Sequence, residues 1–297
     1  MSDIASLPEG QPPAPSGRET GIWAYAITEK DRLTGPDGDI DLSWLTGVGE
    51  TVRTIAYRRL AVLVSDVDLA EFGGAALQAN MEDLDWLNEV ARLHHYVVDA
   101  AARQLPLLPV RLATVYTGEA AACAALAEHH DELLDTLDRI GGRVEWGVKA
   151  YAATGEAAAV PAAQGPAGTA QDDRSDGGGT GDAGPGAGAG LAYLRRRRDQ
   201  LASGREARAA AVDGARTVHA ELAGQAAAAM VRPPQSAQLS GVRQPMLLNA
   251  AYLLDAGDGP GFTAAVAAEA TAHPELRIEL TGPWPPYSFA SDSDVAS

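Results

Sequence analysis

The chain has 297 residues, a length that suits two domains or one domain with a large insertion. Its formal net charge of −17 disfavours nucleic acid or an anionic membrane as a partner, because both are themselves negatively charged. The single cysteine, Cys123, excludes an internal disulfide and fits a reducing cytosol, and no run of 18 apolar residues predicts a membrane span.

The first predicted elements are strands. Residues 1–20 are rich in proline and lack a basic segment followed by an apolar core, so we expect a disordered tail. Strand-like apolar runs follow at Gly21–Ile27, Thr51–Tyr57 and Leu60–Val67. Only Arg58-Arg59 separates the last two, which predicts a hairpin. A longer loop stays open as an alternative, because arginine fits poorly where a tight turn requires positive φ.

Helices then alternate with strands. Apolar residues recur every three or four positions over residues 80–104 and 119–140, which predicts two amphipathic helices. Strand patterns occupy 107–116 and 143–151. We therefore expect residues 21–151 to form an α+β domain, ferredoxin-like in outline, whose helices lie on one face of the sheet.

The next segment differs in composition. Residues 152–190 are rich in glycine and alanine and hold no core-forming side chain larger than Val160. Such a segment buries too little apolar surface to offset the entropy lost on ordering, so we expect a disordered linker.

A second α+β domain is predicted over residues 191–290, with a tail at 291–297. Apolar residues at a loose seven-residue spacing over 191–231 predict a long helix that is bent, folded into a hairpin or coiled-coil-like. The remaining elements are a strand, a helix and a strand, at Met246–Leu254, Gly261–Ala272 and Arg277–Leu280.

Known catalytic patterns are not evident. The pairs His94-His95 and His129-His130 are each adjacent on a helix, so their side chains diverge by about 100° and cannot simply share one metal ion. The glycine-rich segments lack the preceding strand and the following lysine of a phosphate loop. We therefore expect no enzymatic activity, no cofactor and no metal. Arg195–Arg198 surround one helical turn without interleaved aromatics, which favours contact with an acidic protein surface over nucleic acid.

Residues 281–289, here called the arm, contain three prolines and three aromatic residues. Proline fixes φ and restricts the residue before it, so the arm is predicted to be stiff and extended. It either closes the core of the C-terminal domain or offers an aromatic anchor to a partner. The strand directly before it favours the first alternative, in which truncation of Trp284 lowers the melting temperature markedly.

A second stretch, residues 145–149, combines charged and aromatic side chains. Alternation on a strand directs Glu145 and Lys149 to one face and Trp146 to the other. The stretch is either a charge ladder over a packed tryptophan or a functional surface that Arg111 joins from a neighbouring strand. The candidate partner-binding residues are therefore Arg111, Glu145, Trp146, Lys149, Trp284 and Tyr287.

Three motifs in this order resemble the gas-vesicle protein F/L family: Leu108-Pro109-Val110-Arg111, Val144–Lys149 and the arm. The resemblance covers 21–151 and about 191–290, and the segment between them is longer than the family's pattern suggests. It implies a non-enzymatic assembly factor or minor structural component, located in the cytoplasm or on the gas vesicle. Such a protein would bind the small hydrophobic shell protein, keep it soluble during vesicle nucleation, and contact other accessory proteins. The alternative is a small-molecule enzyme or sensor on a ferredoxin-like fold.

Overall fold

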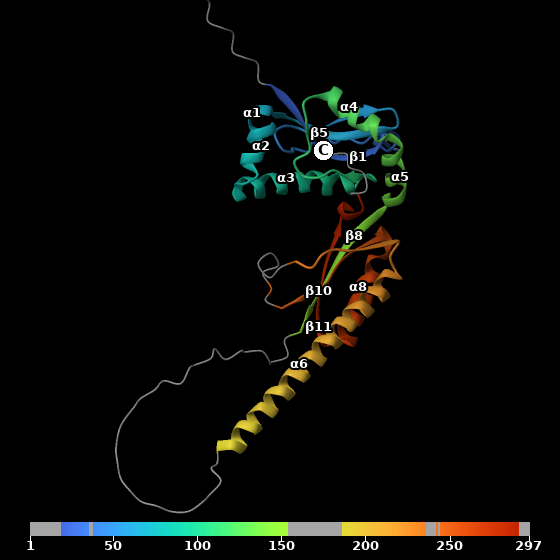
Figure 1. The fold of residues 1–297 in the computed structure, drawn as a ribbon. Coiled ribbons are helices and arrows are strands. Elements are labelled where there is room, and N and C mark those ends of the chain that lie inside the picture. Colours follow the sequence, from blue (N-terminus) through green and yellow to red (C-terminus); the bar gives the residue numbers. More distant parts are fainter. Residues whose placement is uncertain (1–18, 36–37, 154–185, 236–241, 243, 291–297) are drawn as a thin grey trace, which may run out of the picture. The chain divides into compact units, whose positions relative to one another are not determined.

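The computed structural model describes residues 19–35, 38–153, 186–235, 242 and 244–290 (Figure 1). Most or all of each predicted tail and of the predicted linker lies outside these residues. The fold is α+β, as expected, with two antiparallel sheets and a small two-stranded ribbon.

Contacts divide the chain into two compact units, and neither is continuous in sequence. Unit 1 comprises Met1–Glu145, Leu253–Ala256 and Gly282–Ser297, and unit 2 comprises Trp146–Tyr252 and Gly257–Thr281. The boundaries expected from the sequence, and the ferredoxin-like outline of the N-terminal domain, stay predictions.

The sheet of unit 1 is built around β1 (Thr20–Glu29), whose residues 21–28 are all buried. Its strand order is β4-β5-β1-β6, and β7 also pairs with β1. β4 and β5 form the predicted hairpin with a two-residue turn, and not with the longer loop that was the alternative. Arg58 adopts a φ of 52° in this turn. The other bounds are β4 Arg53–Tyr57, β5 Leu60–Asp68, β6 Leu108–Pro109, β7 Val115–Tyr116 and the ribbon β2 Thr34–Gly35 with β3 Gly38–Asp39.

The predicted strand over 107–116 is broken. Val110 N–H donates to Tyr25 O and Thr114 O accepts from Ala24 N–H, so both ends of the break stay on β1 while the residues between them leave the sheet. Ala113 adopts a φ of 67° in the resulting turn. Because that turn separates β6 from β7, Arg111 lies on a loop and not on a strand.

The principal helix of unit 1 is α3 (Leu84–Ala102). The Asp83 carboxylate caps its start by accepting from the backbone N–H groups of Asp85 and Trp86, which satisfies two otherwise unpaired donors. One face packs on the sheet through residues at helical spacing, namely Val90, His94, Val97, Val98 and Ala101. The other helices of unit 1 are α1 Leu69–Phe72, α2 Gly74–Asn80, α4 Glu119–Glu128 and α5 His130–Ile140.

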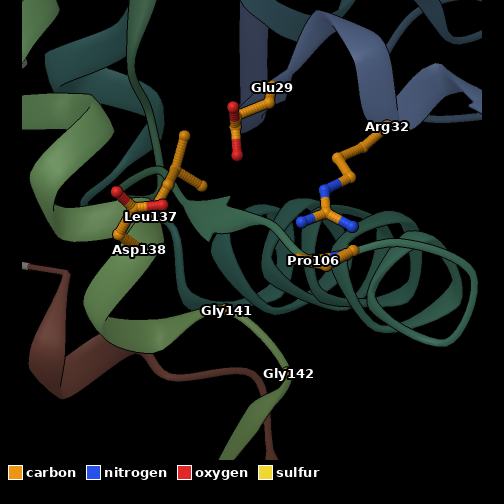
Figure 2. A pocket seen from close by; sticks show the side chains of 7 residues that line it. All are labelled: Glu29, Arg32, Pro106, Leu137, Asp138, Gly141 and Gly142. Carbon is orange, nitrogen blue, oxygen red and sulfur yellow. The ribbon is translucent and has the colours of Figure 1, made fainter.

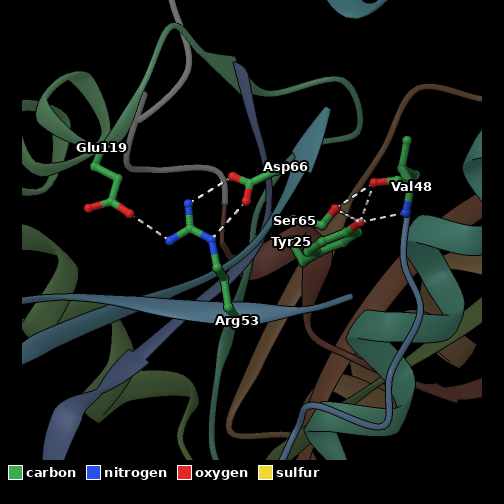
Figure 3. A network of polar contacts seen from close by, with 6 residues as sticks. All are labelled: Tyr25, Val48, Arg53, Ser65, Asp66 and Glu119. Carbon is green, nitrogen blue, oxygen red and sulfur yellow. Dashed lines mark hydrogen bonds and ion pairs between the residues drawn. The ribbon is translucent and has the colours of Figure 1, made fainter. Parts of the chain in front are cut away.

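Figure 3 shows a buried polar group between β1, β5 and the loop before β4. The Tyr25 hydroxyl lies 2.6 Å from Ser65 Oγ and accepts from Val48 N–H at 2.6 Å, while Ser65 Oγ donates to Val48 O. A Cβ on Gly47 would lie 2.0 Å from the Tyr25 oxygen, so glycine is required there. Nearby, the Arg53 guanidinium binds both carboxylate oxygens of Asp66.

The second sheet, most of which belongs to unit 2, has the strand order β11-β8-β10-β9. The sequence placed β8 (Arg143–Ala152) in the N-terminal sheet, but its neighbours are β10 (Met246–Asp255) and β11 (Leu276–Trp284). The hydrophobic alternation of β8 identifies a strand but does not identify the strands beside it. The residues predicted to end the long helix instead form β9 (Ala228–Val231).

One helix dominates unit 2. α6 (Gly186–Ala223) is a continuous helix of 38 residues, so the hairpin alternative is wrong. Its C-terminal part packs through Ala211, Ala215, Val218 and Leu222, and α8 (Gly259–Ala272) lies against it. The described residues include no helix with the length and apolar character needed to cross a membrane.

Tyr25→Phe should lower the free energy of unfolding by about 1–3 kcal/mol, because Val48 N–H and Ser65 Oγ lose a buried partner. Tyr193→Phe is the matched control, since its side chain is 65% exposed and its loss should be within about 0.5 kcal/mol. Urea denaturation of the two variants measures both values. Equal stability of the variants would contradict the assigned role of the Tyr25 hydroxyl.

Candidate functional site

The end of the arm is held by buried contacts within unit 1. The Glu145 carboxylate accepts from both the backbone N–H, at 2.7 Å, and the hydroxyl of Ser288. Arg139 Nη2 donates to Phe289 O at 3.1 Å. Glu145, Ser288 and Phe289 are all buried. The arm therefore ends in a fixed position.

Two aromatic rings of the arm flank one histidine of α3. The His95 ring stacks on Tyr287, with ring centroids 5.8 Å apart, and lies 5.5 Å from the Trp284 centroid. Tyr287 packs against the core of unit 1, and burial raises the pKa of its hydroxyl, to which the charge of Asp99 adds. Trp284 remains 44% exposed. One ring therefore anchors the arm and the other faces solvent.

This arrangement corrects the expectation that the arm closes the core of the C-terminal domain. Residues from Gly282 onward belong to unit 1, where Tyr287 packs on the core and Ser288 binds Glu145. A large stability loss is no longer expected for Trp284→Ala, because about half of the side chain is already in water.

The exposed tryptophan has polar and aromatic neighbours on α3. A shallow groove of about 510 Å³ lies along this helix and includes His95, which contacts Trp284. Tyr96 in the same groove is 52% exposed. We call this region the α3–arm surface, and it comprises Asn88, Arg92, His95, Tyr96, Asp99 and Trp284.

Beneath this surface, His94 joins α3 to the sheet. Its Nδ1 accepts from Trp23 Nε1 at 3.0 Å, so its Nε2 carries the proton and donates to Val110 O at 3.2 Å. Burial lowers the pKa of His94 to about 4; the hydrogen bond to Val110 opposes this, and His95 adds to it. His94 is therefore a neutral structural histidine.

The other sequence candidates belong to different elements and to both units. Arg111 is exposed on the loop between β6 and β7 in unit 1. In unit 2, Lys149 Nζ donates to Gln235 Oε1 at 3.1 Å, and the Trp146 ring packs 6.3 Å from that of Phe262. Glu145 supports the arm. The neighbouring-strand arrangement assumed for Arg111 is not present, because β6 pairs with β1 and β8 pairs with β10 and β11.

Figure 2 shows a polar cleft of about 280 Å³ in unit 1, and it bears on the enzyme alternative. Its charged lining residues are Glu29, Arg32 and Asp138, and the Glu29 carboxylate accepts from Arg59 Nη2 at 2.8 Å. Its lining includes no serine, threonine, cysteine, lysine or histidine. The part of the chain that the structure describes also holds no group of three or more residues suited to a metal ion. Nothing in this cleft favours a particular reaction.

Sequence reasoning identified Trp284 and Tyr287 but missed their neighbours on α3. His95 and Tyr96 were assigned only to an amphipathic helix. The available signal was Tyr96, a large aromatic side chain that lies off the apolar stripe of that helix and is 52% exposed. Such side chains mark an interaction surface only once the elements beside them are known.

Glu145→Gln should lower the free energy of unfolding by about 1–3 kcal/mol, because an amide cannot accept from both Ser288 donors without presenting its own N–H. It should also make Trp284 fluorescence more accessible to acrylamide. Glu206→Gln is the control, since its side chain is exposed on α6. Unchanged stability of Glu145→Gln would show that the arm is held by other contacts.

The folded-state pKa of His94 lies below its ordinary value of 6.5, so the unfolded chain takes up a proton first as the pH falls. The stability due to neutral His94 is therefore complete above pH 6.5 and is lost as the pH falls towards 4. Between pH 7 and 5 we expect a loss of about 2 kcal/mol. His94→Gln should remove most of this pH dependence, whereas the control His129→Gln, at a half-buried position between α4 and α5, should retain it, as measured by urea denaturation at each pH. Equal pH dependence in both variants would contradict this assignment.

Comparisons with known proteins agree in one family. The model of the family described as gas vesicle synthesis protein GvpL/GvpF matches residues 21–291. Gas vesicle protein L of Streptomyces sp. (strain CB03234) is 37% identical over 277 residues, which cover 92% of this chain and 94% of that protein. Gas vesicle protein F of the same organism is 28% identical, with coverages of 90% and 98%.

Solved structures resemble the fold. The crystal structure of GvpF from Anabaena sp. PCC7120 has a TM-score of 0.57 at 17% identity, covering 92% of this chain and 96% of that one. GvpF from Microcystis aeruginosa has a TM-score of 0.56 at 17% identity, with coverages of 91% and 99%. The chain therefore belongs to the gas vesicle synthesis protein GvpL/GvpF family, and this membership supports a role in gas vesicle assembly.

Proposed function

We propose that the protein binds the small hydrophobic shell protein of the gas vesicle through the α3–arm surface and keeps it soluble during vesicle nucleation. Family membership supports the assembly role, and the geometry of the arm supports this more specific activity. Other gas vesicle accessory proteins are further partners in this proposal, which places the protein in the cytoplasm and at the growing vesicle.

The observation that carries the proposal is an exposed tryptophan on a fixed support. Tryptophan is enriched among the residues that dominate binding energies, since it buries a large area with few rotatable bonds. Trp284 is 44% exposed, while Ser288 and Phe289 after it are 3% and 4% exposed. Because the arm is held by Glu145 and Arg139, binding at Trp284 costs little additional ordering.

The net charge fits the solubilising part of the proposal. A partner that covers exposed apolar surface keeps the complex in solution only if the complex stays strongly charged. A charge of −17 supplies this provided the shell protein carries little opposite charge. The residues that line the cleft of Figure 2 give less support to an enzyme or a sensor than the arm gives to shell-protein binding.

Trp284→Ala should weaken binding of the purified shell protein by at least about 30-fold, equivalent to about 2 kcal/mol. The melting temperature should change little, because the side chain is half exposed and the arm keeps its buried contacts. Affinity is measured by bio-layer interferometry with detergent-solubilised shell protein, and stability by thermal denaturation. Tyr96→Ala should weaken binding in the same direction.

Trp44→Ala is the matched control, because Trp44 is another tryptophan of unit 1 and is 55% exposed outside the α3–arm surface. It should bind the shell protein as the parent protein does. The proposal fails if the two tryptophan variants bind equally well, or if Trp284→Ala loses binding only as far as it loses stability.

A further inference from the structure

The N-terminal half of α6 has no packing partner in the part of the chain that the structure describes. All described side chains between residues 191 and 210 are exposed, and burial begins at Ala211. Large apolar side chains lie within this half, and Leu191, Tyr193, Leu194 and Leu201 are each more than half exposed. In Figure 1 the corresponding yellow segment extends beyond β10 and β11 of the same unit. An exposed helix of this length with several large apolar residues is typical of an interaction surface.

The face of α6 that packs in its C-terminal half lines an open groove in its N-terminal half. Positions 200, 204, 207 and 211 follow one another at spacings of three or four, and 215, 218 and 222 continue the same face. The groove has a volume of about 980 Å³. Its opposite wall includes Leu247 at the start of β10 and Pro274 at the turn before β11. All of its lining residues belong to unit 2. We call it the α6 groove.

The α6 groove is apolar at its centre and carries charged residues at its edges. Gly204, Ala207 and Ala211 present small side chains that allow another chain to approach closely. Arg196 and Arg208 lie about 18 Å apart along the helix and form no ion pair among the described residues.

Two acidic residues, Asp199 and Glu275, also line the groove, and neither forms an ion pair with Arg196 or Arg208. Asp199 lies 3.5 Å from Arg198, and Glu275 Oε1 lies 2.9 Å from His273 Nδ1. The two groove arginines, on either side of an apolar centre, therefore have no carboxylate partner among the described residues.

We propose that the α6 groove binds an acidic amphipathic helix of another protein. The apolar residues of that helix would contact Ala207, Ala211 and Leu247. Two of its carboxylates, 11 or 12 residues apart, would pair with Arg196 and Arg208, since guanidinium binds carboxylate through two parallel hydrogen bonds. This second docking site is independent of the shell-protein site proposed for unit 1.

A helical occupant fits better than an extended one. β-Strand addition requires a free sheet edge, but the strands that reach the groove are β8 and β10. Both are inner strands in the order β11-β8-β10-β9. Their backbone groups are therefore already paired on both sides, and recognition has to depend on side chains.

A second copy of α6, a nucleic acid and an anionic membrane are each disfavoured. Residues 191–210 contain six arginines and only two acidic residues, so pairing two such segments would place like charges together. Arg195–Arg198 surround one helical turn without interleaved aromatic residues, which disfavours a nucleic acid. Arg198 and Arg205 interrupt the stripe of Leu194 and Leu201, which disfavours insertion of this face into a membrane.

Site-specific cross-linking in cells that form gas vesicles tests the occupant. A photoreactive benzoylphenylalanine replaces Ala207, which lines the groove, or Ala209, which lies on the opposite face of α6 as the matched control. We expect position 207 alone to yield a cross-link, and mass spectrometry should place it in an acidic helical segment of another protein. A cross-link to a second copy, to nucleic acid, to lipid or to residues 154–185 of the same chain would overturn the proposal, as would the absence of a position-dependent product.

A charge exchange in the full-length protein tests the recognition directly. The probes are two helical 18-residue peptides with the same leucine stripe, one with glutamates 11 or 12 residues apart and one with lysines in their place. The parent protein should bind the glutamate peptide at least tenfold more tightly, and added salt should weaken this binding. Arg196→Glu with Arg208→Glu should reverse the preference, whereas Arg205→Glu, which does not line the groove, should retain it.

Equal binding of both peptides, or an unchanged preference in the double variant, would refute charge recognition at the groove. Shell-protein binding by the double variant should equal that of the parent. Failure of the proposal for α6 is thereby distinguishable from failure of the proposal for Trp284.

Discussion

The Glu145–Ser288 contact is the interaction on which the candidate surface depends. It joins residues 143 positions apart in the sequence and buries a carboxylate against a backbone N–H and a hydroxyl. A buried carboxylate is tolerated only when such donors compensate its lost hydration. The compensation fixes Ser288, and the stiff prolines before it then limit where Trp284 lies. An aromatic residue that would otherwise move freely is thus held at the surface.

Both proposed docking surfaces arise because a helix is longer or more exposed than its sheet requires. α3 buries a stripe of small and β-branched residues and leaves Tyr96 and Leu84 outside. α6 has buried side chains from Ala211 onward, and its described side chains between residues 191 and 210 are exposed. A strongly acidic chain can keep such surfaces exposed without self-association, because like net charges repel between copies.

Helices and hairpins were predictable from the sequence where the spacing of apolar residues determines them. The hairpin of β4 and β5, the helix α3 and the long helix α6 follow from hydrophobic spacing alone. Two interruptions were not predictable, one at Ala113 in the predicted strand 107–116 and one at His129 in the predicted helix 119–140. Neither position is a glycine or a proline that would mark it, although Ala113 has a φ of 67°. Of the site, the aromatic arm was identified in advance. Its support by Glu145 was not, since that contact exists only once the chain is folded.

The length of the connection before the arm did not predict which part of the molecule the arm contacts. Trp284 follows the predicted strand Arg277–Leu280 by four residues and is the last residue of β11, and a short connection limits how far a side chain can reach. It does not determine direction, and β11 passes from unit 2 to unit 1 at Gly282. The direction is determined by the groups that contact the arm. The Glu145 carboxylate and the Arg139 guanidinium form hydrogen bonds with it, and the His95 ring stacks on Tyr287. Stiffness fixes the shape of such a segment, and buried polar partners decide where it docks.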